Sequence, residues 1–341
     1  MTRTESRVWT HIDFTANGVQ SGSANVPHSS DTSAYGVLPV PMICIRGGDG
    51  PTALLTAGTH GDEYEGQIAL LELVQDLRRA SDEGRIAGRI LVLPSLNRPA
   101  VLAGRRNSPL DGGNLNRVFP GKADGSPTEM IADYVTSVLF PMSDLVIDLH
   151  SGGSSLQYLP IALARPGLDA QAKAAIRSLL DSFGAPTSVI TKGSGGGANS
   201  TLYAAAEAAG IPALTTELGG GPTLTQPGLD IARRGLRQVL LDFGIVSGLE
   251  TPSVPATRLM RTLGPGSSIF APHDGLFVPL VHQGEVVEKD QLAGLLHRLD
   301  DPLADVTRLH FRAAGEVVWK RFPTLTSAGD ALYGLMVPFT Q

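Results

Sequence analysis

A chain of 341 residues, of which 42% are hydrophobic and 18% charged, is long enough for two or three domains with cores of their own. The net charge of −6 and the lack of a basic cluster exclude nucleic acid as an expected partner. No apolar run approaches the roughly 20 residues of a membrane span, and residues 1–14 lack the apolar core of a signal peptide, so we predict a cytoplasmic protein without membrane contact. The single cysteine, Cys44, lies in an apolar run and is expected to be a buried thiol, so any metal must be held by histidine and carboxylate.

The first 50 residues are expected to form short strands and turns, with strands over residues 7–14 and 37–45. From residue 52 onward, strand-like and helix-like segments alternate, which is typical of a mostly parallel sheet with helices on its faces. The predicted strands are 53–57, 89–94, 144–150, 187–191 and 213–217, and the predicted helices are 66–80, 127–140, 168–183, 199–209 and 227–243. We therefore expect residues 1–250 to form an α/β domain with a doubly wound, mixed sheet.

A stretch rich in proline and glycine at residues 249–268 predicts a boundary, so residues 251–341 are expected to form a second domain. In this part the run that starts at Asp290 (DQLAGLL) is similar to the run that starts at Asp330 (DALYGLM), at an offset of forty residues. The repeat predicts a small, barrel-sandwich-like β domain with internal two-fold symmetry, similar to biotinyl and lipoyl carrier modules. Those carriers have a modified lysine between their halves, and residues 297–306 contain no lysine. We therefore expect a domain that is structural or shapes the substrate site.

The candidate chemistry begins where the strand 53–57 ends, in the sequence Gly-Thr-His60-Gly-Asp-Glu63. In open α/β sheets this edge is where ligands bind. A His and a Glu three residues apart can reach the same atom, and catalytic zinc commonly takes two His and one Glu and keeps a fourth position open. The pair alone is a weak signal, because many such pairs are exposed helix residues. Glu65 is expected to be an acidic first-turn residue that the dipole of the following helix favours.

Two further strand ends carry candidate residues. His150 follows the strand 145–149 and should emerge at the same edge as His60, which makes it the predicted third ligand. Asp148 lies two residues earlier on the same strand face, where it could orient a ligand histidine or an arginine, or serve as a buried structural carboxylate. Glu217 ends another strand, where a carboxylate can take a proton from water and deliver it to a leaving amine. An ordinary salt bridge is the alternative for Glu217.

The loop of residues 97–121 is too long and too polar to be only a connection. Its charged and amide side chains are Arg98, Arg105, Arg106, Asp111, Asn114, Asn116 and Arg117. Arginine forms bidentate pairs with carboxylates and can offset the charge of an oxyanion. A basic surface loop is the alternative, which applies to Arg98 and Arg105 more than to the compact Asn116-Arg117.

Two other features are assigned no chemistry. The run Gly-Ser-Gly-Gly-Gly at residues 193–197 lacks the Lys-Ser/Thr of a phosphate-binding loop and predicts a lid-like loop at the sheet edge. Glu207, on the predicted helix 199–209, is expected to face solvent.

Taken in order, these motifs resemble those of the succinylglutamate desuccinylase/aspartoacylase family. The matching residues are Gly-x-His60-Gly-Asp-Glu63-x-Glu-Gly, Asn97, Arg106-Asn-Ser-Pro-Leu-Asp111-Gly-Gly-Asn-Leu-Asn116-Arg117, Asp148-Leu-His150-Ser-Gly and Thr216-Glu217. The resemblance covers most of the chain and implies a fold of zinc-carboxypeptidase type with a C-terminal β domain. One departure is Asn97-Arg-Pro99, where the family often has Asn-Pro.

The resemblance also implies a role for each matching residue. One Zn²⁺ per chain would be held by His60, Glu63 and His150. Glu217 would be the general base and Arg106 would polarise the scissile carbonyl. A substrate carboxylate would be held by the pair Asn116 and Arg117.

These roles predict zinc-dependent hydrolysis of the amide bond of a small-molecule N-acyl amino acid, with release of a short carboxylate and a free amine. Within the family the chain resembles the N-acetyl-diaminobutyrate deacetylases of ectoine breakdown, which implies deacetylation of N-acetyl-diaminobutyrate. Two alternatives stay open. A zinc carboxypeptidase acting on peptides would share every ligand, and a non-catalytic binding protein would share the carrier-like β module. A homo-oligomer is also left open.

Overall fold

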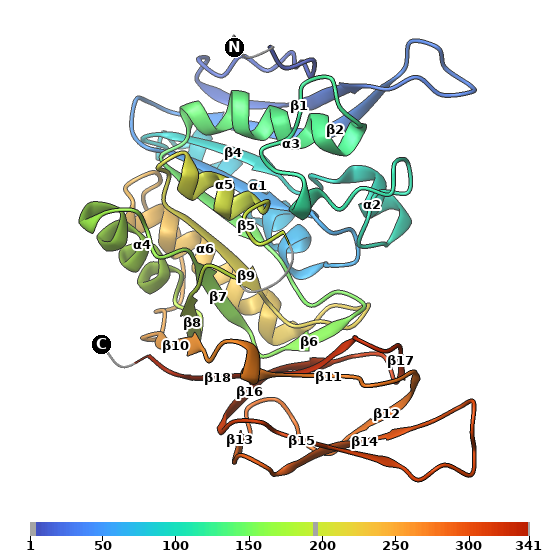
Figure 1. Cartoon of the computed structure of the whole chain (residues 1–341). Coiled ribbons are helices and arrows are strands. Elements are labelled where there is room, and N and C mark those ends of the chain that lie inside the picture. Colours follow the sequence, from blue (N-terminus) through green and yellow to red (C-terminus); the bar gives the residue numbers. More distant parts are fainter. Residues whose placement is uncertain (1–4, 194–196, 340–341) are drawn as a thin grey trace.

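One extended sheet runs through the molecule from the N-terminal hairpin to the C-terminal strands (Figure 1). In the computed structural model, which describes residues 5–193 and 197–339, this sheet has 14 strands. A second sheet of four strands faces its C-terminal end. Residues 194–196 of the predicted lid-like loop lie outside the described part of the chain.

Four parallel strands form the centre of the large sheet, in the order β4 (Arg89–Leu93), β3 (Thr52–Ala57), β5 (Leu145–Leu149) and β9 (Ala213–Glu217). Their side chains are almost entirely buried on both faces, as expected of apolar parallel strands covered by helices. Since the strands are parallel, their carboxyl ends share one edge, and the motif residues follow those ends.

The strands that flank this centre make the sheet mixed, as predicted. On one side, β1 (Gly18–Pro27) pairs antiparallel with β2 (Val37–Arg46), which pairs antiparallel with β4. On the other side, β7 (Ile161–Ala164) is antiparallel to β9, and β8 (Thr187–Ile190) and β10 (Arg258–Thr262) continue the sheet in parallel with β7.

The predicted strand at residues 7–14 is wrong. Of that segment only Trp9 forms a bridge, with Asn25 of β1. The hairpin strand β1 was not predicted, because its two glycines and its polar residues give no alternation of apolar side chains.

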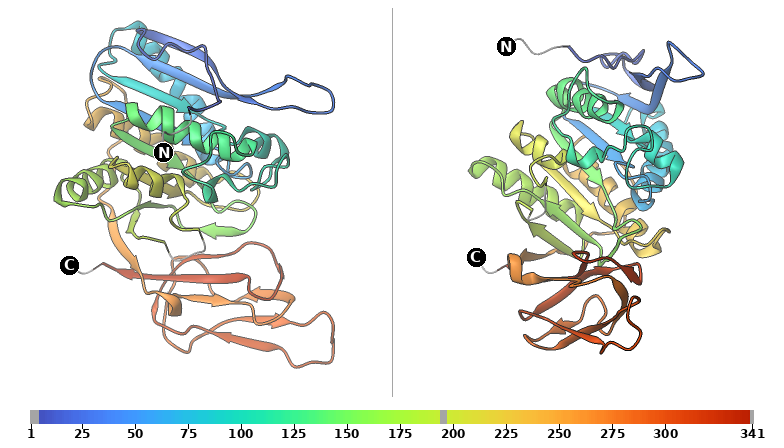
Figure 2. Two further views of the ribbon diagram at one scale, coloured as in Figure 1. Left: turned by 45° about the horizontal axis from the view of Figure 1, so that its top comes forward. Right: turned by 45° about the vertical axis from the view of Figure 1, so that its right-hand side comes forward.

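Helices cover both faces of the sheet, which confirms the doubly wound architecture (Figures 1 and 2). One face is packed by α1 (Glu65–Asp82), α4 (Ala170–Phe183) and α6 (Gln226–Asp242). The opposite face is packed by α3 (Pro127–Tyr134), its continuation through Val135–Leu139 and Phe140–Met142, and α5 (Leu202–Ala208). A short helix, α2 (Arg98–Ala103), and a single turn (Leu115–Arg117) form inside the predicted loop 97–121. No helix in residues 5–193 and 197–339 combines the length and the apolar character needed to cross a membrane.

The C-terminal strands form a sandwich around a core of their own (Figure 1). One layer is the small sheet β15 (Thr307–His310), β14 (Leu292–His297), β12 (Gly275–Pro279) and β17 (Leu325–Thr326). The other layer is the end of the large sheet, made by β11 (Ser268–Phe270), β18 (Ala331–Pro338), β16 (Gly315–Arg321) and β13 (Val286–Val287). A turn at Pro265–Ser267 precedes β11, and β6 (Leu156–Tyr158), from the N-terminal part, pairs with β16.

The predicted repeat is visible in the strand pairing. The pair β12–β14 has its counterpart in β16–β18, and each half gives one short strand to the other: β17 pairs with β12, and β13 pairs with β16. Internal two-fold symmetry follows from this exchange. The division of the chain at residue 250 stays a prediction, because β10 joins β8 to β18 within one sheet.

Cys44 lies fully buried in β2, as expected of a structural thiol. Burial raises the pKa of the Cys44 thiol to about 11, so little of it is thiolate at neutral pH. We expect no reaction of the folded protein with Ellman's reagent at pH 8, and the titration of one thiol per chain after unfolding in urea. Rapid reaction of the folded protein would contradict the packing of β2 against β4.

Candidate metal centre and active site

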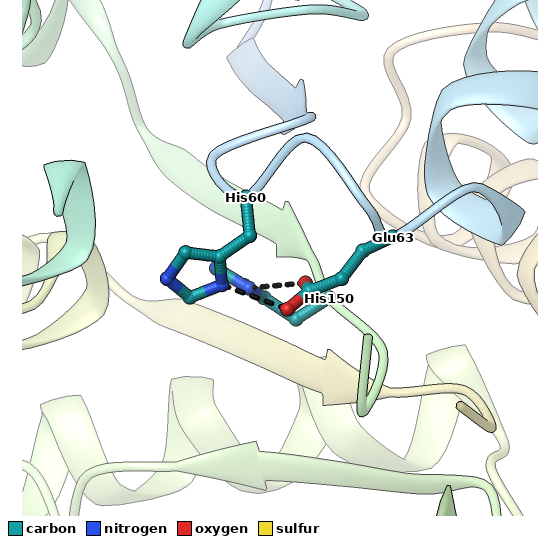
Figure 3. Close-up of side chains that lie close together, drawn as sticks. All are labelled: His60, Glu63 and His150. Atoms are coloured by element: carbon teal, nitrogen blue, oxygen red, sulfur yellow. Dashed lines mark hydrogen bonds and ion pairs between the residues drawn. The ribbon is translucent and has the colours of Figure 1, made fainter. Parts of the chain in front are cut away.

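The structure brings together the three side chains that the sequence predicted as metal ligands (Figure 3). His60 lies in the loop after β3, Glu63 lies just before α1, and His150 follows β5. All three are buried, and one potential ligand atom from each lies within 4.8 Å of the others. Glu63 bridges the two histidines, with Oε1 2.7 Å from Nδ1 of His60 and Oε2 2.8 Å from Nδ1 of His150.

The loop that carries His60 and Glu63 is held against the beginning of the long loop. The backbone N–H of Gly61 donates to the carbonyl of Arg105 over 2.8 Å. A Cβ at position 61 would overlap the carbonyl group of Ala100 in α2, so only glycine permits this approach. The Gly between His60 and Glu63 therefore fixes both side chains against α2.

The outer nitrogen of His150 is held by a carboxylate. Nε2 of His150 lies 2.8 Å from Oδ2 of Asp148, and the other carboxylate oxygen accepts hydrogen bonds from the hydroxyls of Thr56 (2.6 Å) and Thr59 (3.0 Å). Of the two roles considered for Asp148, the structure shows the first, a carboxylate that orients a histidine. Such a contact directs the inner nitrogen toward the centre of the cluster.

The outer nitrogen of His60 is held by a residue to which the sequence assigned no role. Nε2 of His60 lies 3.0 Å from Oδ1 of Asn114, and the same oxygen accepts the backbone N–H of Asn116 over 3.1 Å. Asn114 thus starts the turn Leu115–Arg117 and orients His60 at the same time. The one sequence signal for this role is an amide side chain directly before a short helical turn.

The charges of the cluster favour a cation at its centre. Burial alone would raise the pKa of Glu63, but the charges of His60 and His150 outweigh it and lower that pKa. Burial likewise opposes a charge on His150, but Asp148 and Glu63 raise its pKa well above the usual value. Burial lowers the pKa of His60. The negative charges that hold a proton on His150 equally favour a zinc ion. Once that proton is released, the cluster would offer an ionised carboxylate and two inward-facing imidazole nitrogens, a donor set that fits zinc.

Glu217, at the end of β9, belongs electrostatically to the same site. Burial and the charge of Glu63 raise the pKa of Glu217 well above its usual value, while His150, Arg106 and Arg117 act in the opposite direction. Its Oε2 is buried and has no hydrogen-bond partner in the described part of the chain. A buried carboxylate oxygen without a partner is rare in native structures and marks a position for water or ligand.

Of the two neighbouring arginines in the long loop, one turns to the cluster. A terminal nitrogen of Arg106 lies 3.3 Å from Nδ1 of His60 and 3.6 Å from Oε1 of Glu63, whereas Arg105 is exposed. The guanidinium of Arg106 therefore lies at the mouth of the site, with its side chain 41% exposed.

Asn116 and Arg117 follow on the turn Leu115–Arg117. The amide nitrogen of Asn116 lies 3.3 Å from Nε2 of His150, and its amide oxygen accepts the backbone N–H of Leu202. Burial lowers the pKa of Arg117, and the charge of Arg106 acts in the same direction. Arg117, which is exposed, thus places a positive charge near Arg106 and Glu217.

Other polar residues of the long loop are structural. Asp111 accepts hydrogen bonds from the backbone and the hydroxyl of Thr128, both over 2.8 Å, and so fixes the start of α3. Arg98 donates to the carbonyl of Pro39 in β2. Neither side chain is among the groups that converge at the cluster.

The expectation about Glu207 is wrong, and the one about Glu65 is confirmed but incomplete. Glu207 does not simply face solvent: it forms an ion pair of 2.6 Å with Arg165 and accepts the backbone N–H of Gly167. Glu65 does begin α1, but it is also buried and accepts hydrogen bonds from the backbone and hydroxyl of Thr225. Both partners are distant in sequence, so no local pattern indicated them.

The comparisons with known proteins agree with this geometry. The family model for the succinylglutamate desuccinylase/aspartoacylase catalytic domain matches residues 49–242, which include every residue of the cluster. The chain belongs to this family. Membership confirms the predicted enzyme class, an amidohydrolase of N-acyl amino acids. It decides against the alternative of a non-catalytic binding protein.

Similar family members span nearly the whole chain. N-alpha-acetyl-L-2,4-diaminobutyric acid deacetylase of Halomonas elongata is 41% identical over 326 residues, which are 94% of this chain and 92% of that protein. The product-bound structure of the ectoine utilization protein EutE (DoeB) of Ruegeria pomeroyi is 37% identical, with a TM-score of 0.91 over 98% of this chain and 100% of that one. A succinylglutamate desuccinylase/aspartoacylase structure from Rhodobacter sphaeroides is 34% identical, with a TM-score of 0.90 over the same shares. These matches confirm the predicted fold, including its C-terminal β part.

Proposed function

We propose that this amidohydrolase removes the acetyl group of N-acetyl-L-2,4-diaminobutyrate with one zinc ion per chain. The observation that carries the proposal is the buried cluster of His60, Glu63 and His150 beside the unpartnered carboxylate oxygen of Glu217. The choice of substrate is supported by the 41% identity to a deacetylase of that compound.

The zinc ion would be held by Nδ1 of His60, Nδ1 of His150 and the carboxylate of Glu63. In such a site zinc supplies Lewis acidity, which acts on an amide carbonyl and on water. Asp148 and Asn114 keep the two imidazoles oriented through their outer nitrogens, so the inner nitrogens stay directed at the centre.

The protein's own groups then move the protons. Glu217, whose Oε2 has no hydrogen-bond partner among the described residues, takes a proton from the attacking water as the new C–O bond forms. The same carboxyl group delivers this proton to the amide nitrogen as the C–N bond breaks, which leaves acetate and the free amine. Arg106 lies close enough to the cluster to offset negative charge on the former carbonyl oxygen. Arg117, beside Asn116, would bind the free carboxylate of the substrate.

Amine release from a panel of substrates tests the proposal. The zinc-loaded protein should hydrolyse N-alpha-acetyl-L-2,4-diaminobutyrate with a kcat/KM at least about tenfold above those for N-acetyl-aspartate and N-succinyl-glutamate. A substrate pocket shaped for one amino-acid side chain discriminates against others by about this factor. A preference for either of the latter compounds would overturn the choice of substrate and keep the enzyme class.

A zinc carboxypeptidase is the remaining alternative, and dipeptides with a free C-terminal carboxylate belong in the same panel. Turnover of these peptides faster than that of acetyl-amino acids would favour it. We also propose, from the sequence, that the protein is cytoplasmic.

A further inference from the structure

Tyr158, the last residue of β6, lies beside Glu217 although the two residues come from different parts of the chain. Its backbone N–H donates to the carbonyl of Gly219 over 2.8 Å, two residues beyond Glu217. Ile161 pairs directly with Glu217 across β7 and β9, so their side chains share one face of the sheet. Tyr158 packs against the small apolar cluster that contains Ile161. These contacts place the phenol on the side of the sheet where Glu217 acts.

The C-terminal β part holds the Tyr158 ring from the other side. Trp319 of β16 is paired with Tyr158 of β6, and their rings lie 6.2 Å apart at 45° (Figure 1 shows β6 along β16). On the next strand, β18, Gly334 pairs with Trp319, and a Cβ at position 334 would overlap the Trp319 indole. Glycine at 334 thus lets the indole lie flat across β18, and the indole in turn supports the tyrosine.

The phenol is a hydrogen-bond donor that the described residues leave open. Within residues 5–193 and 197–339, the structure shows no hydrogen bond of the Tyr158 hydroxyl, and the residue is half-buried. Burial raises the pKa of Tyr158 well above its usual value, the charge of Glu217 adds to the shift, and Arg106 opposes it. The hydroxyl is therefore protonated at neutral pH and lies close enough to Glu217 and Arg106 for their charges to act on it.

We propose that the Tyr158 hydroxyl donates a hydrogen bond to an oxygen of the bound acyl-amino acid, and that Trp319 of the C-terminal β part positions it. The proposal rests on the proposed function and gives the C-terminal strands a task in substrate binding. Since the contact is made in the bound substrate before any bond changes, its loss weakens binding and leaves the chemical step intact.

Tyr158→Phe removes the hydroxyl and keeps the ring on Trp319. We expect KM for N-acetyl-L-2,4-diaminobutyrate to rise about five- to tenfold, the order for one lost hydrogen bond, with kcat within twofold of the wild type. The matched control is Tyr134→Phe, which removes a buried hydroxyl without a partner far along α3 and should leave KM unchanged. An unchanged KM for Tyr158→Phe, or a fall in kcat alone, would overturn the substrate contact.

Trp319→Phe tests the positioning role, because a smaller ring leaves Tyr158 unsupported. It should raise KM in the wild-type background and add nothing to Tyr158→Phe, since both changes act through the same hydroxyl. Additive effects would overturn the link. If Trp319→Phe fails to fold, Gly334→Ala, which displaces the indole, takes its place in the same cycle.

One further measurement separates this proposal from the proposed function. In the Glu217→Gln background, calorimetric titration with N-acetyl-L-2,4-diaminobutyrate gives Kd without turnover, and Tyr158→Phe should raise that Kd by the same factor as KM. A wild type that binds this compound but does not hydrolyse it would refute the proposed function. The Tyr158 contact would then be judged from the Kd values of the variants alone. Equal Kd values with and without the hydroxyl would refute the contact alone.

Discussion

Glu217→Gln is expected to lower kcat about 10³-fold, the contribution typical of a general acid and base. The amide cannot accept a proton from water, yet it has nearly the size and shape of the carboxylate. Burial and the charge of Glu63 already raise the pKa of Glu217, so the ionised carboxylate is unfavourable where it lies. The variant should therefore be at least as stable to heat as the wild type, with unchanged zinc content.

Steady-state kinetics, metal analysis and thermal unfolding check the three parts of this expectation. Glu83→Gln is a matched control, because Glu83 is exposed and forms a surface ion pair with Arg85. It should retain full activity. Glu217→Gln with activity close to the wild type would show that another group moves the proton.

Glu63→Ala is expected to abolish zinc binding and to lower activity by at least about 10³-fold, because the Lewis acidity supplied by the metal is lost with it. The carboxylate contacts both histidines, and Oε2 also accepts the backbone N–H of Ser151. Its removal leaves two imidazoles without the negative charge that the site places between them. Zinc per chain, measured after dialysis against trace metal, should fall from about one to near zero.

Asp148→Asn provides a graded comparison. Asp148 contacts the outer nitrogen, Nε2, of His150. Replacing the Asp148 carboxylate with an amide should therefore weaken zinc affinity about 10- to 100-fold without abolishing zinc binding. Competition with a chromophoric chelator measures both variants. Full zinc occupancy in Glu63→Ala would overturn the assignment of Glu63 as a ligand.

The parts of the site that could be predicted from sequence are those carried by strand ends. His150 and Glu217 each follow a short apolar strand and precede glycines, and His60 follows a third such strand. In a parallel sheet these positions meet at one edge whatever the helices do. Order along the chain was therefore enough to bring them together. The central strands and the five predicted helices follow from local sequence patterns in the same way.

The remainder depends on pairing between segments that are distant in sequence. The position of Tyr158 depends on the pairing of β6 with β16, about 160 residues later in the chain. No local pattern in Leu156–Tyr158 predicts this pairing. The same holds for Glu207, whose partner Arg165 lies forty-two residues earlier. Asn114 is different: its role arises locally, but a loop amide that starts a turn is too common to single out.

The strand β10 joins β8 on one side and β18 on the other, so backbone hydrogen bonds run without a break from the catalytic strands into the C-terminal part. The C-terminal strands consequently cannot be exchanged for another domain without disrupting the large sheet. Removing them would leave the hydrogen-bonding edge of β10 or β8 open, the kind of edge that recruits strands of other chains. Recombination between relatives would have to carry β6, β10 and the C-terminal strands together to keep the contact between Tyr158 and Trp319.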